Sequence, residues 1–316
     1  MSKLCFGVDI GGTTVKLGLF TSAGELREQW EIPTRTEEKG KNILPDTAEF
    51  INKKIEELQL DKNDILGIGV GVPGPVVDES VVYECVNLGW GTVDVAKEMK
   101  ELTGLRTKVN NDANVAALGE QWRGGGKGYD SVVMITLGTG VGGGVILDQK
   151  IRSGSKGAAG EIGHIMVNME ETDTCGCGKQ GCLEQFASAS GIVKEAKRLL
   201  QHSDKASTLR GIENLTAKDI FDKAKEGDEL ALESVDQLGK YLALATSHIS
   251  AVIDPQAYVI GGGVSKAGQI LIDTIKKYYD PFVMKALKGR EFKLAELGND
   301  AGIYGSAKMV VGSIIE

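Results

Sequence analysis

The sequence predicts a duplicated α/β fold with two lobes and a cleft between them. The first observation is a turn rich in glycine and threonine at residues 9–14, which lies between two apolar strands. The second observation is the recurrence of the same arrangement at residues 136–144. Because strand, turn and strand follow in the same order at both places, we interpret the chain as an internal duplication with one copy in each lobe.

The other elements follow from the hydrophobic pattern in chain order. Apolar runs bounded by turn residues indicate strands, and apolar residues at helical spacing indicate helices, one of which Gly104 ends. We expect strands at 4–8, 15–20, 26–32, 65–72, 132–137, 145–151 and 257–260. We expect helices at 42–58, 93–103, 192–201, 217–226, 229–253 and 300–315. The last helix is expected to return to the first lobe, so we assign residues 1–112 and 301–316 to a small lobe and 113–300 to a large lobe.

Composition limits the class of protein. The chain has 316 residues, of which 41% are hydrophobic and 25% charged, as in a globular protein with ample apolar residues for its cores. The net charge of −8 disfavours a nucleic-acid partner and suits an enzyme that acts on small molecules. No apolar run has the length of a membrane span, and the N-terminus shows no signal region. We therefore expect a cytoplasmic protein with no membrane partner.

One segment concentrates the residues that bind metals. The chain has three histidines and five cysteines, and His164, Cys175, Cys177 and Cys182 fall close together. One histidine and three cysteines complete a tetrahedral Zn²⁺ site, and four protein ligands leave no position for water, so the zinc is expected to be structural. The alternatives are a disulfide or free thiols. Cys175 and Cys177 are too close in sequence for an easy disulfide, and nothing in the chain suggests secretion.

The glycine turns suggest a nucleotide site. Backbone N–H groups without neighbouring side chains can approach phosphate oxygens, and threonine hydroxyls add donors. A third glycine cluster follows the strand expected at 257–260. The alternative is that the glycines only form tight hairpins, which the repetition disfavours. The candidate residues are Gly11, Gly12 and Thr13 in the first turn, Gly138, Thr139 and Gly140 in the second, and Gly261, Gly262 and Gly263 in the third.

Two acidic residues stand at the ends of expected strands. Asp9 at the first turn could hold Mg²⁺ through water, since Mg²⁺ keeps several waters and takes few carboxylates. Asp112 stands where a short strand meets a helix, which is where α/β folds place reactive groups. The alternative for Asp112 is a helix N-cap without chemistry.

A formal match to the dinucleotide fingerprint, Gly138-x-Gly140-x-x-Gly143, is misleading. That fingerprint requires a helix directly after the glycines, whereas residues 145–147 predict a strand. We therefore exclude a dinucleotide-binding fold.

Taken together, these motifs resemble the ROK family of bacterial sugar kinases, and most closely its zinc-containing glucokinases. The resemblance covers essentially the whole chain. It implies an actin-like, ribonuclease-H-like duplicated α/β fold, often assembled as a homodimer or homotetramer, and phosphorylation of a hexose by ATP. The segments that carry the resemblance are 9–13, 111–114, 137–140, 161–164, 175–184 and 260–263.

The resemblance also assigns roles to single residues. Asp112 is similar to the family's general base, which takes the proton from the sugar 6-hydroxyl. His164 corresponds to a residue with one ring nitrogen on zinc and the other toward the sugar. Thr13, Thr139 and the third glycine cluster resemble contacts to phosphate and adenosine. Lys16 departs from the family, in which many members place lysine directly after the threonine of the first turn, and is expected to be a surface lysine. The residues that correspond to sugar contacts are Gly74, Asn111, Asp112, Glu161, His164 and Glu184.

Glucose is the expected substrate, and alternatives remain. The first is a kinase for N-acetylmannosamine, N-acetylglucosamine or another hexose. The second is a sugar-sensing protein without catalysis, against which Asp112 argues. A repressor of the same family would carry an N-terminal helix-turn-helix, for which a first strand at Leu4 leaves no room. The phosphoryl donor, which could be ATP, another nucleotide or polyphosphate, stays open.

Overall fold

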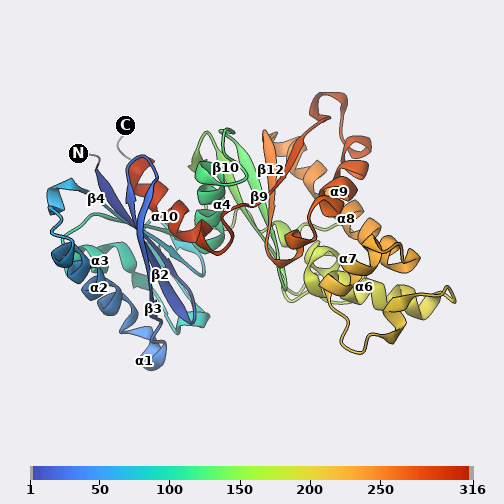
Figure 1. The fold of residues 1–316 in the computed structure, drawn as a ribbon, viewed down its shortest axis with the longest axis horizontal. Helices are drawn as coiled ribbons and strands as arrows, with labels where there is room; N and C mark the ends of the chain where they lie inside the picture. The colour runs from blue at the N-terminus through green and yellow to red at the C-terminus, as the bar shows by residue number, and fades with distance from the viewer. Residues whose placement is uncertain (1–2, 313–316) are drawn as a thin grey trace. The chain divides into compact units, whose positions relative to one another are not determined.

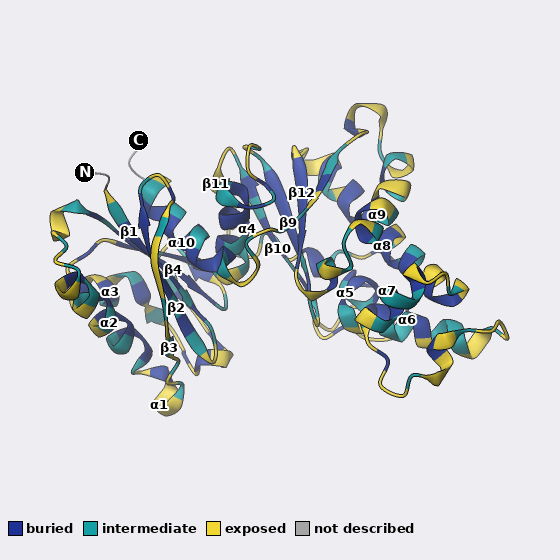
Figure 2. Cartoon of the chain, viewed as in Figure 1, coloured by how far each residue is buried: buried dark blue, intermediate teal, exposed yellow. Residues whose placement is uncertain are grey.

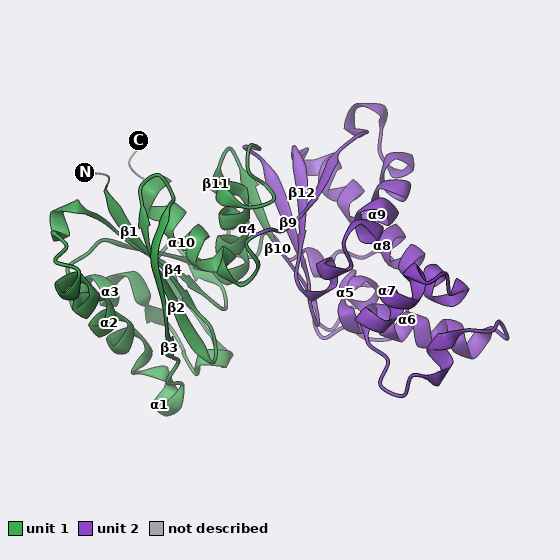
Figure 3. Cartoon of the chain, in the orientation of Figure 1, with its two compact units in different colours: residues 1–128, 144–159, 297–316 green, residues 129–143, 160–296 purple. Residues whose placement is uncertain are grey.

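Two compact units and two five-stranded sheets of the same strand order make up the structure, a computed structural model that describes residues 3–312 (Figure 1). Unit 1 comprises residues 1–128, 144–159 and 297–316, and unit 2 comprises 129–143 and 160–296 (Figure 3). One five-stranded sheet has the order β3-β2-β1-β4-β8, and the other has the order β11-β10-β9-β12-β13. If the five strands of each sheet are counted in chain order, both sheets have the spatial order 3-2-1-4-5. The internal duplication predicted from the two glycine turns is confirmed by this topology.

The main sheet of unit 1 carries helices on both faces. Its larger core lies between the strands and helices α2 and α3, and a second cluster packs around Phe20 under helix α10. Figure 2 shows the resulting band of buried residues along the strands. The strands are β1 (Leu4–Ile10), β2 (Thr14–Thr21), β3 (Leu26–Pro33), β4 (Ile65–Val72) and β8 (Thr107–Asn111), with a small sheet of β5 (Val76–Val77), β6 (Val81–Val82) and β7 (Val93–Asp94). The helices are α1 (Glu37–Gly40), α2 (Ile43–Glu57), α3 (Val95–Thr103), α4 (Asp112–Arg123) and α10 (Ala301–Val311).

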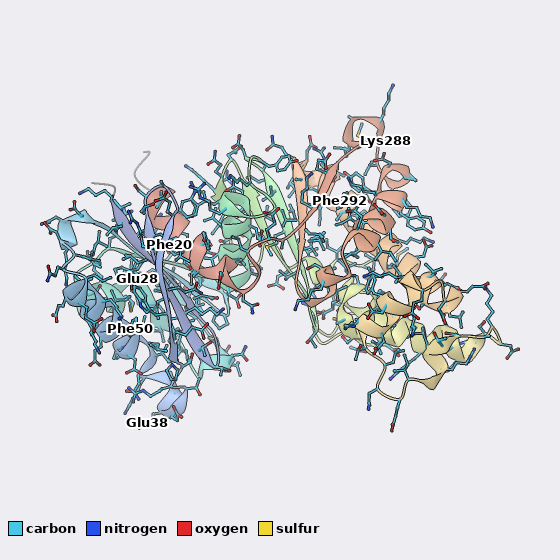
Figure 4. The ribbon with its side chains drawn as sticks, in the orientation of Figure 1. Phe20, Glu28, Glu38, Phe50, Lys288 and Phe292 are labelled. Atoms are coloured by element: carbon cyan, nitrogen blue, oxygen red, sulfur yellow. The ribbon has the colours of Figure 1, made fainter. Side chains whose placement is uncertain are left out.

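Unit 2 contains most of the remaining helices. Phe292 lies on the edge strand of this unit (Figure 4). Its ring stacks on Tyr258 with ring centroids 5.1 Å apart, and both rings are buried in the unit's core. The strands of the second sheet are β9 (Val132–Leu137), β10 (Val141–Leu147), β11 (Lys150–Ile151), β12 (Ala257–Gly261) and β13 (Glu291–Leu294). The helices are α5 (Glu184–Ala187), α6 (Ala189–His202), α7 (Ala217–Lys225), α8 (Glu229–Ile253) and α9 (Gln269–Phe282).

Short 3-10 helices join several of these elements. They are η1 (Lys62–Asp64), η2 (Val86–Leu88), η3 (Ile162–His164), η4 (Thr208–Gly211), η5 (Gly263–Ala267), η6 (Lys285–Leu287) and η7 (Gly298–Asp300). No helix in the described range 3–312 is long and apolar enough to cross a membrane.

Several predicted bounds are reproduced and others move. The strands at 65–72 and 132–137 and the helix at 229–253 have the expected limits. The helix expected from residue 93 begins at Val95, because the preceding pair forms β7 and the Asp94 side chain accepts a hydrogen bond from the N–H of Lys97. The strand expected at 145–151 is two strands, since residues 148 and 149 turn with positive φ angles. The last positions of the helix predicted at 300–315, residues 313–315, lie outside the described residues.

The compact units and the predicted lobes differ at residues 113–128, 144–159 and 297–300, which the prediction assigns to the large lobe and which belong to unit 1. The predicted boundary at 112/113 places α4 in the large lobe, whereas α4 packs against α10 and belongs to unit 1. The C-terminal helix α10 belongs to unit 1. The cleft between the lobes stays a prediction.

Glycines allow α10 to approach its neighbours at backbone distance. A Cβ atom at Gly7 of β1 or Gly69 of β4 would overlap a carbonyl oxygen of α10, that of Ile303 or Ser306. A Cβ atom at Gly305 of α10 would likewise overlap the carbonyl oxygen of Val115 in α4. These three positions therefore require glycine for steric reasons, although glycine lowers intrinsic helix and strand stability.

We expect Gly305→Ala to destabilise the protein by about 1–3 kcal/mol, because α4 and α10 must move apart to admit the methyl group. Helix propensity alone predicts the opposite sign. Urea unfolding measures the difference, with Gly91→Ala as the matched control, since no heavy atom lies within 4 Å of a Cβ built there. A Gly305→Ala variant as stable as Gly91→Ala would contradict the close packing.

A partly buried ion network fixes α6 of unit 2 to the segment before the cysteines. The Glu171 side chain is 3% exposed, and its two carboxylate oxygens accept hydrogen bonds from Arg198 at 2.8 and 3.1 Å. The backbone N–H groups of Thr172 and Asp173 also donate to Glu171 Oε1, each at 2.9 Å. The Arg198 hydrogen bonds lower the pKa of Glu171 to about 2, against the opposing effect of burial.

A lowered pKa means that Glu171 stabilises the fold above its ordinary value of 4.5 and that this contribution disappears as the pH falls toward 2. We expect Glu171→Gln to lower the unfolding free energy by about 1–3 kcal/mol at pH 7, because Arg198 loses its charged partner. The wild type and the variant should converge gradually as the pH falls from about 4.5 toward 2. Chemical unfolding from pH 7 to pH 2 measures both, and exposed Glu101→Gln serves as control. A difference that does not change with pH would contradict the prediction.

Candidate functional site

The candidate residues of unit 1 meet at one edge of its sheet. Strands β1, β4 and β8 are parallel neighbours, so their carboxyl ends lie together. Asp9 lies near the end of β1, Gly74 follows β4, and Asn111 ends β8. The folded chain thus brings together three positions that are widely separated in sequence.

Asn111, and not Asp112, provides the main cap of helix α4. Its Oδ1 accepts hydrogen bonds from the N–H groups of Ala113 and Asn114 at 3.0 and 3.4 Å, and its Nδ2 donates to the carbonyl oxygen of Gly74 at 3.0 Å. Asp112 is the first helical residue and is exposed, with Oδ1 2.8 Å from the Ala113 nitrogen. Because Asn111 caps α4, a capping role does not explain why residue 112 is acidic.

Asp9 is a buried carboxylate close to a second one. Burial, and next the negative charge of Asp112, raise the pKa of Asp9 to about 6, while Lys16 acts in the opposite direction. The carboxylate lies against Gly302 in the first turn of α10, where a Cβ atom would overlap it. Two neighbouring carboxylates repel each other unless a cation lies between or beside them. This edge of unit 1 therefore suits a divalent cation.

Lys16 is partly buried, whereas the sequence suggests a surface lysine. Its side chain is 20% exposed, and its Nζ lies 3.6 Å from both Glu31 and Asp300. It also donates a hydrogen bond to the carbonyl oxygen of Asn299 at 3.1 Å. The residue thus ties β2 to the start of α10 and supplies the positive charge that acts on Asp9.

The first glycine turn lies at the same end of β1. The Gly11 N–H donates to the carbonyl oxygen of Thr14 at 2.9 Å, and the Thr34 hydroxyl donates to the carbonyl oxygen of Gly11 at 2.7 Å. Gly12 and Thr13, which follow Gly11 in the turn, are exposed to solvent. Hydrogen bonds thus fix the turn at Gly11, while Gly12 and Thr13 remain accessible.

In unit 2 the predicted metal ligands converge. The ligand atoms of His164, Cys175, Cys177 and Cys182 all lie within 4.8 Å of one another. Cys175 Sγ lies 3.8 Å from His164 Nδ1, and Cys177 Sγ lies 3.6 Å from Cys182 Sγ. Zinc bonds of about 2.3 Å to sulfur and about 2.0–2.1 Å to nitrogen place the atoms of a tetrahedron at roughly these separations. The four residues therefore fit Zn²⁺.

The candidate metal ligands lie close to the predicted sugar-binding residues of unit 2. His164 Nδ1 lies 3.8 Å from Glu184 Oε1, and His164 Nε2 lies 3.8 Å from Glu161 Oε2. The Cys175 thiol donates to Glu184 Oε1 at 2.9 Å. The side of the imidazole that faces the thiols thus differs from the side that faces Glu161. One ring can consequently bind metal through Nδ1 and a polar ligand through Nε2.

The second and third glycine clusters lie at one edge of the second sheet. Strands β9 and β12 are parallel, with Thr136 opposite Gly261, so the turns that follow them are neighbours. Gly262 has a φ of 81°, and a Cβ there would overlap backbone atoms of Leu137. Strand β10 follows the second cluster directly, which confirms the exclusion of a dinucleotide-binding fold.

Residues at the start of α6 form hydrogen bonds with the second glycine turn, and the sequence did not predict their role. The Ser190 hydroxyl donates to the carbonyl oxygen of Thr139 at 2.7 Å, and the Ala189 N–H donates to that of Gly138 at 2.8 Å. A cavity of about 530 Å³ opens beside the turn. The serines at 188 and 190 before a helical pattern were the signal that could have found it. Its wall includes Thr139, Gly140, Thr174, Cys175, Glu184, Ser188, Ser190, Gly191 and Lys194.

The candidate residues therefore form two groups, each assembled within its own unit. Unit 1 brings together Asp9, Gly11, Gly12, Thr13, Gly74, Asn111 and Asp112. Unit 2 brings together Gly138, Thr139, Gly140, Gly261, Gly262 and Gly263 near the edge of its sheet, and Glu161, His164 and Glu184 around the cysteines.

Comparison with known proteins identifies the family. Residues 5–312 match the ROK family. A glucokinase of Halalkalibacterium halodurans is 42% identical over 311 residues, which are 96% of this chain and 94% of that protein. A ROK family glucokinase from Streptomyces griseus, solved in complex with glucose and AMPPNP, is 33% identical with a TM-score of 0.69 and covers 97% of this chain and 98% of its own. A ROK hexokinase from Thermus thermophilus is 27% identical with a TM-score of 0.82 and covers 99% of both chains. The actin-like duplicated fold is confirmed by these structures, and the chain belongs to the ROK family.

Proposed function

We propose that this protein phosphorylates glucose at its 6-hydroxyl, with ATP as the phosphoryl donor. The observation that carries the proposal is the exposed Asp112 carboxylate at the start of α4, beside the Asn111–Gly74 hydrogen bond and close to the buried Asp9. The relatives named glucokinase, and the glucose and AMPPNP complex of one of them, support the same reaction.

Asp112 would act as the general base. A sugar hydroxyl becomes a competent nucleophile when a carboxylate within hydrogen-bond reach accepts its proton. The Asn111 cap fixes the first turn of α4 and hence the backbone that carries Asp112. The residues proposed to hold glucose are Gly74, Asn111, Glu161, His164 and Glu184.

The glycine turns would hold the nucleotide. Phosphoryl transfer depends chiefly on positioning and on stabilisation of phosphate charge. Backbone N–H groups of the first and second turns suit the phosphates, and the third cluster suits the adenosine. Asp9 would hold Mg²⁺ through water, and the cation would neutralise phosphate charge.

Zinc would have a structural part in the same reaction. Held by His164, Cys175, Cys177 and Cys182, it would fix the loop that presents His164 and Glu184 to the sugar. Four protein ligands leave the ion no open position, so we assign it no chemical step.

A second candidate is a kinase for N-acetylmannosamine, N-acetylglucosamine or another hexose, because carboxylates and amides that converge on a sugar can select among hydroxyl patterns. A coupled assay with a panel of hexoses and of donors, including polyphosphate, tests the proposal. The highest kcat/KM with glucose and ATP is expected. A higher value with an N-acetylated sugar would favour the second candidate. The homodimer or homotetramer, the cytoplasmic location and a role in glycolysis stay predictions from the family resemblance.

We expect Asp112→Asn to lower kcat by about 10²–10⁴-fold while glucose affinity changes little, because Asn keeps the shape but cannot accept a proton. A coupled assay and calorimetry on one preparation separate the two quantities. Asp94→Asn is the matched control, since Asp94 caps α3 and Asn caps equally well. Near-normal turnover of Asp112→Asn would exclude the base role, and lost affinity with retained turnover would make Asp112 a binding residue only.

About one zinc ion per chain is expected from the four-ligand cluster. Cys177→Ser should lose the metal and weaken glucose binding, because the loop that carries Glu184 loses its support. Elemental analysis and calorimetry are the measurements, and Thr174→Ser, which changes the same loop but no ligand, is the control. A metal-free preparation with full stability and full glucose affinity would refute the structural zinc.

A further inference from the structure

A cavity of about 810 Å³ lies in unit 1, apart from the candidate site. Its wall comes from β5, β8, α4, α10 and the segment after β10, and it includes neither Asp9 nor Asp112. The volume is within the range of small-molecule sites. The wall also offers hydroxyl groups, from Ser153 and Ser155, that can bind a polar ligand.

Lys308 of α10 gives the cavity wall a positive charge. No described residue forms a hydrogen bond or an ion pair with Lys308, and its Nζ lies over the Trp122 ring, 5.5 Å from the ring centroid. The Arg123 guanidinium lies over the same ring at 5.0 Å. Burial and the charge of Arg123 lower the pKa of Lys308, and no described carboxylate acts on it in the opposite direction.

The other charges of the wall largely compensate one another. Lys108 pairs with Glu79 at 2.6 Å, and Arg152 lies 3.5 Å from Asp148. Lys150 and Asp78, which also line the cavity, carry opposite charges. Lys308 is therefore the cation of the wall that lacks a compensating acid among the described residues.

A partly buried ammonium beside a guanidinium is electrostatically costly unless an anion binds there. A ligand with a phosphate group supplies the charge, and its oxygens can also accept a hydrogen bond from the Ser155 hydroxyl, since the Ser153 hydroxyl donates to Asn110. We propose that this cavity is a binding site for a phosphate-bearing small molecule, with Lys308 as its principal charged contact. This inference does not depend on the proposed function.

Hydrogen bonds connect the wall of this cavity to the N-cap of α4. Asn110 lines the cavity, and its Oδ1 accepts hydrogen bonds from Ser153 Oγ at 3.4 Å and from the Asn111 N–H at 2.9 Å. A ligand in the cavity would thus lie two hydrogen bonds from the cap of α4, without touching the candidate catalytic residue.

The test is calorimetric titration of the full chain with inorganic phosphate and with glucose 6-phosphate, in phosphate-free buffer at constant chloride. Lys308→Met keeps the apolar stem and removes the charge, and it should weaken binding of a probe by at least about tenfold. Lys285→Met, an exposed lysine of unit 2, is the matched control and should bind as the wild type does. Turnover measured on the same preparations reports separately on the proposed function.

Two outcomes would overturn the proposal. The first is that neither probe binds the wild type. The second is equal binding by Lys308→Met and wild type, which would place the phosphate elsewhere, for instance at the glycine turns. Because Lys308→Met removes an uncompensated charge, it is expected to fold with undiminished thermal stability, which a melting curve verifies.

Discussion

The close backbone approach of α10 to its neighbours is the constraint on which unit 1 depends. This helix comes from the far end of the chain, yet it lies directly on β1 and β4 and against α4. Each contact requires a residue without a Cβ atom, at Gly7, Gly69 and Gly305. Because protein interiors are close-packed, a methyl group at any of these places displaces an entire helix. The position of α4, which carries Asp112, is therefore set by contacts distant from the chemistry.

The same helix sets the environment of Asp9. Gly302 in its first turn leaves room for the carboxylate, and Asp300 before it pairs with Lys16. The carboxylate is thus held under α10, beside a second acid and near one cation. Such an arrangement costs free energy in the absence of a bound cation, which is usual where a protein is organised for charge that arrives with its substrate.

Unit 2 obtains rigidity at its site by different means. The residues proposed to bind the sugar are on a loop with little regular structure, where the candidate metal ligands cluster and the Glu171–Arg198 network supplies order that helix packing supplies in unit 1. The glycine turns of this unit are fixed instead by hydrogen bonds from the start of α6. A loop that carries binding residues needs such supports, since backbone outside helices and sheets lacks the regular hydrogen bonds that hold those elements in place.

The sequence by itself determined the duplicated fold class, most strand positions and the two clusters that carry chemistry. It could do so because alternating apolar runs, glycine turns and a cysteine–histidine set are local patterns with local physical causes. It did not determine that Asn111 caps α4, that Lys16 joins β2 to α10, or that α4 belongs with unit 1. It also missed Ser190 and Lys308, because a serine at a helix start and a lysine on a helix face are common in every protein. These assignments depend on which distant segments the fold brings into contact, and only the tertiary structure decides that, since one residue's neighbours in space are set by the packing of whole elements.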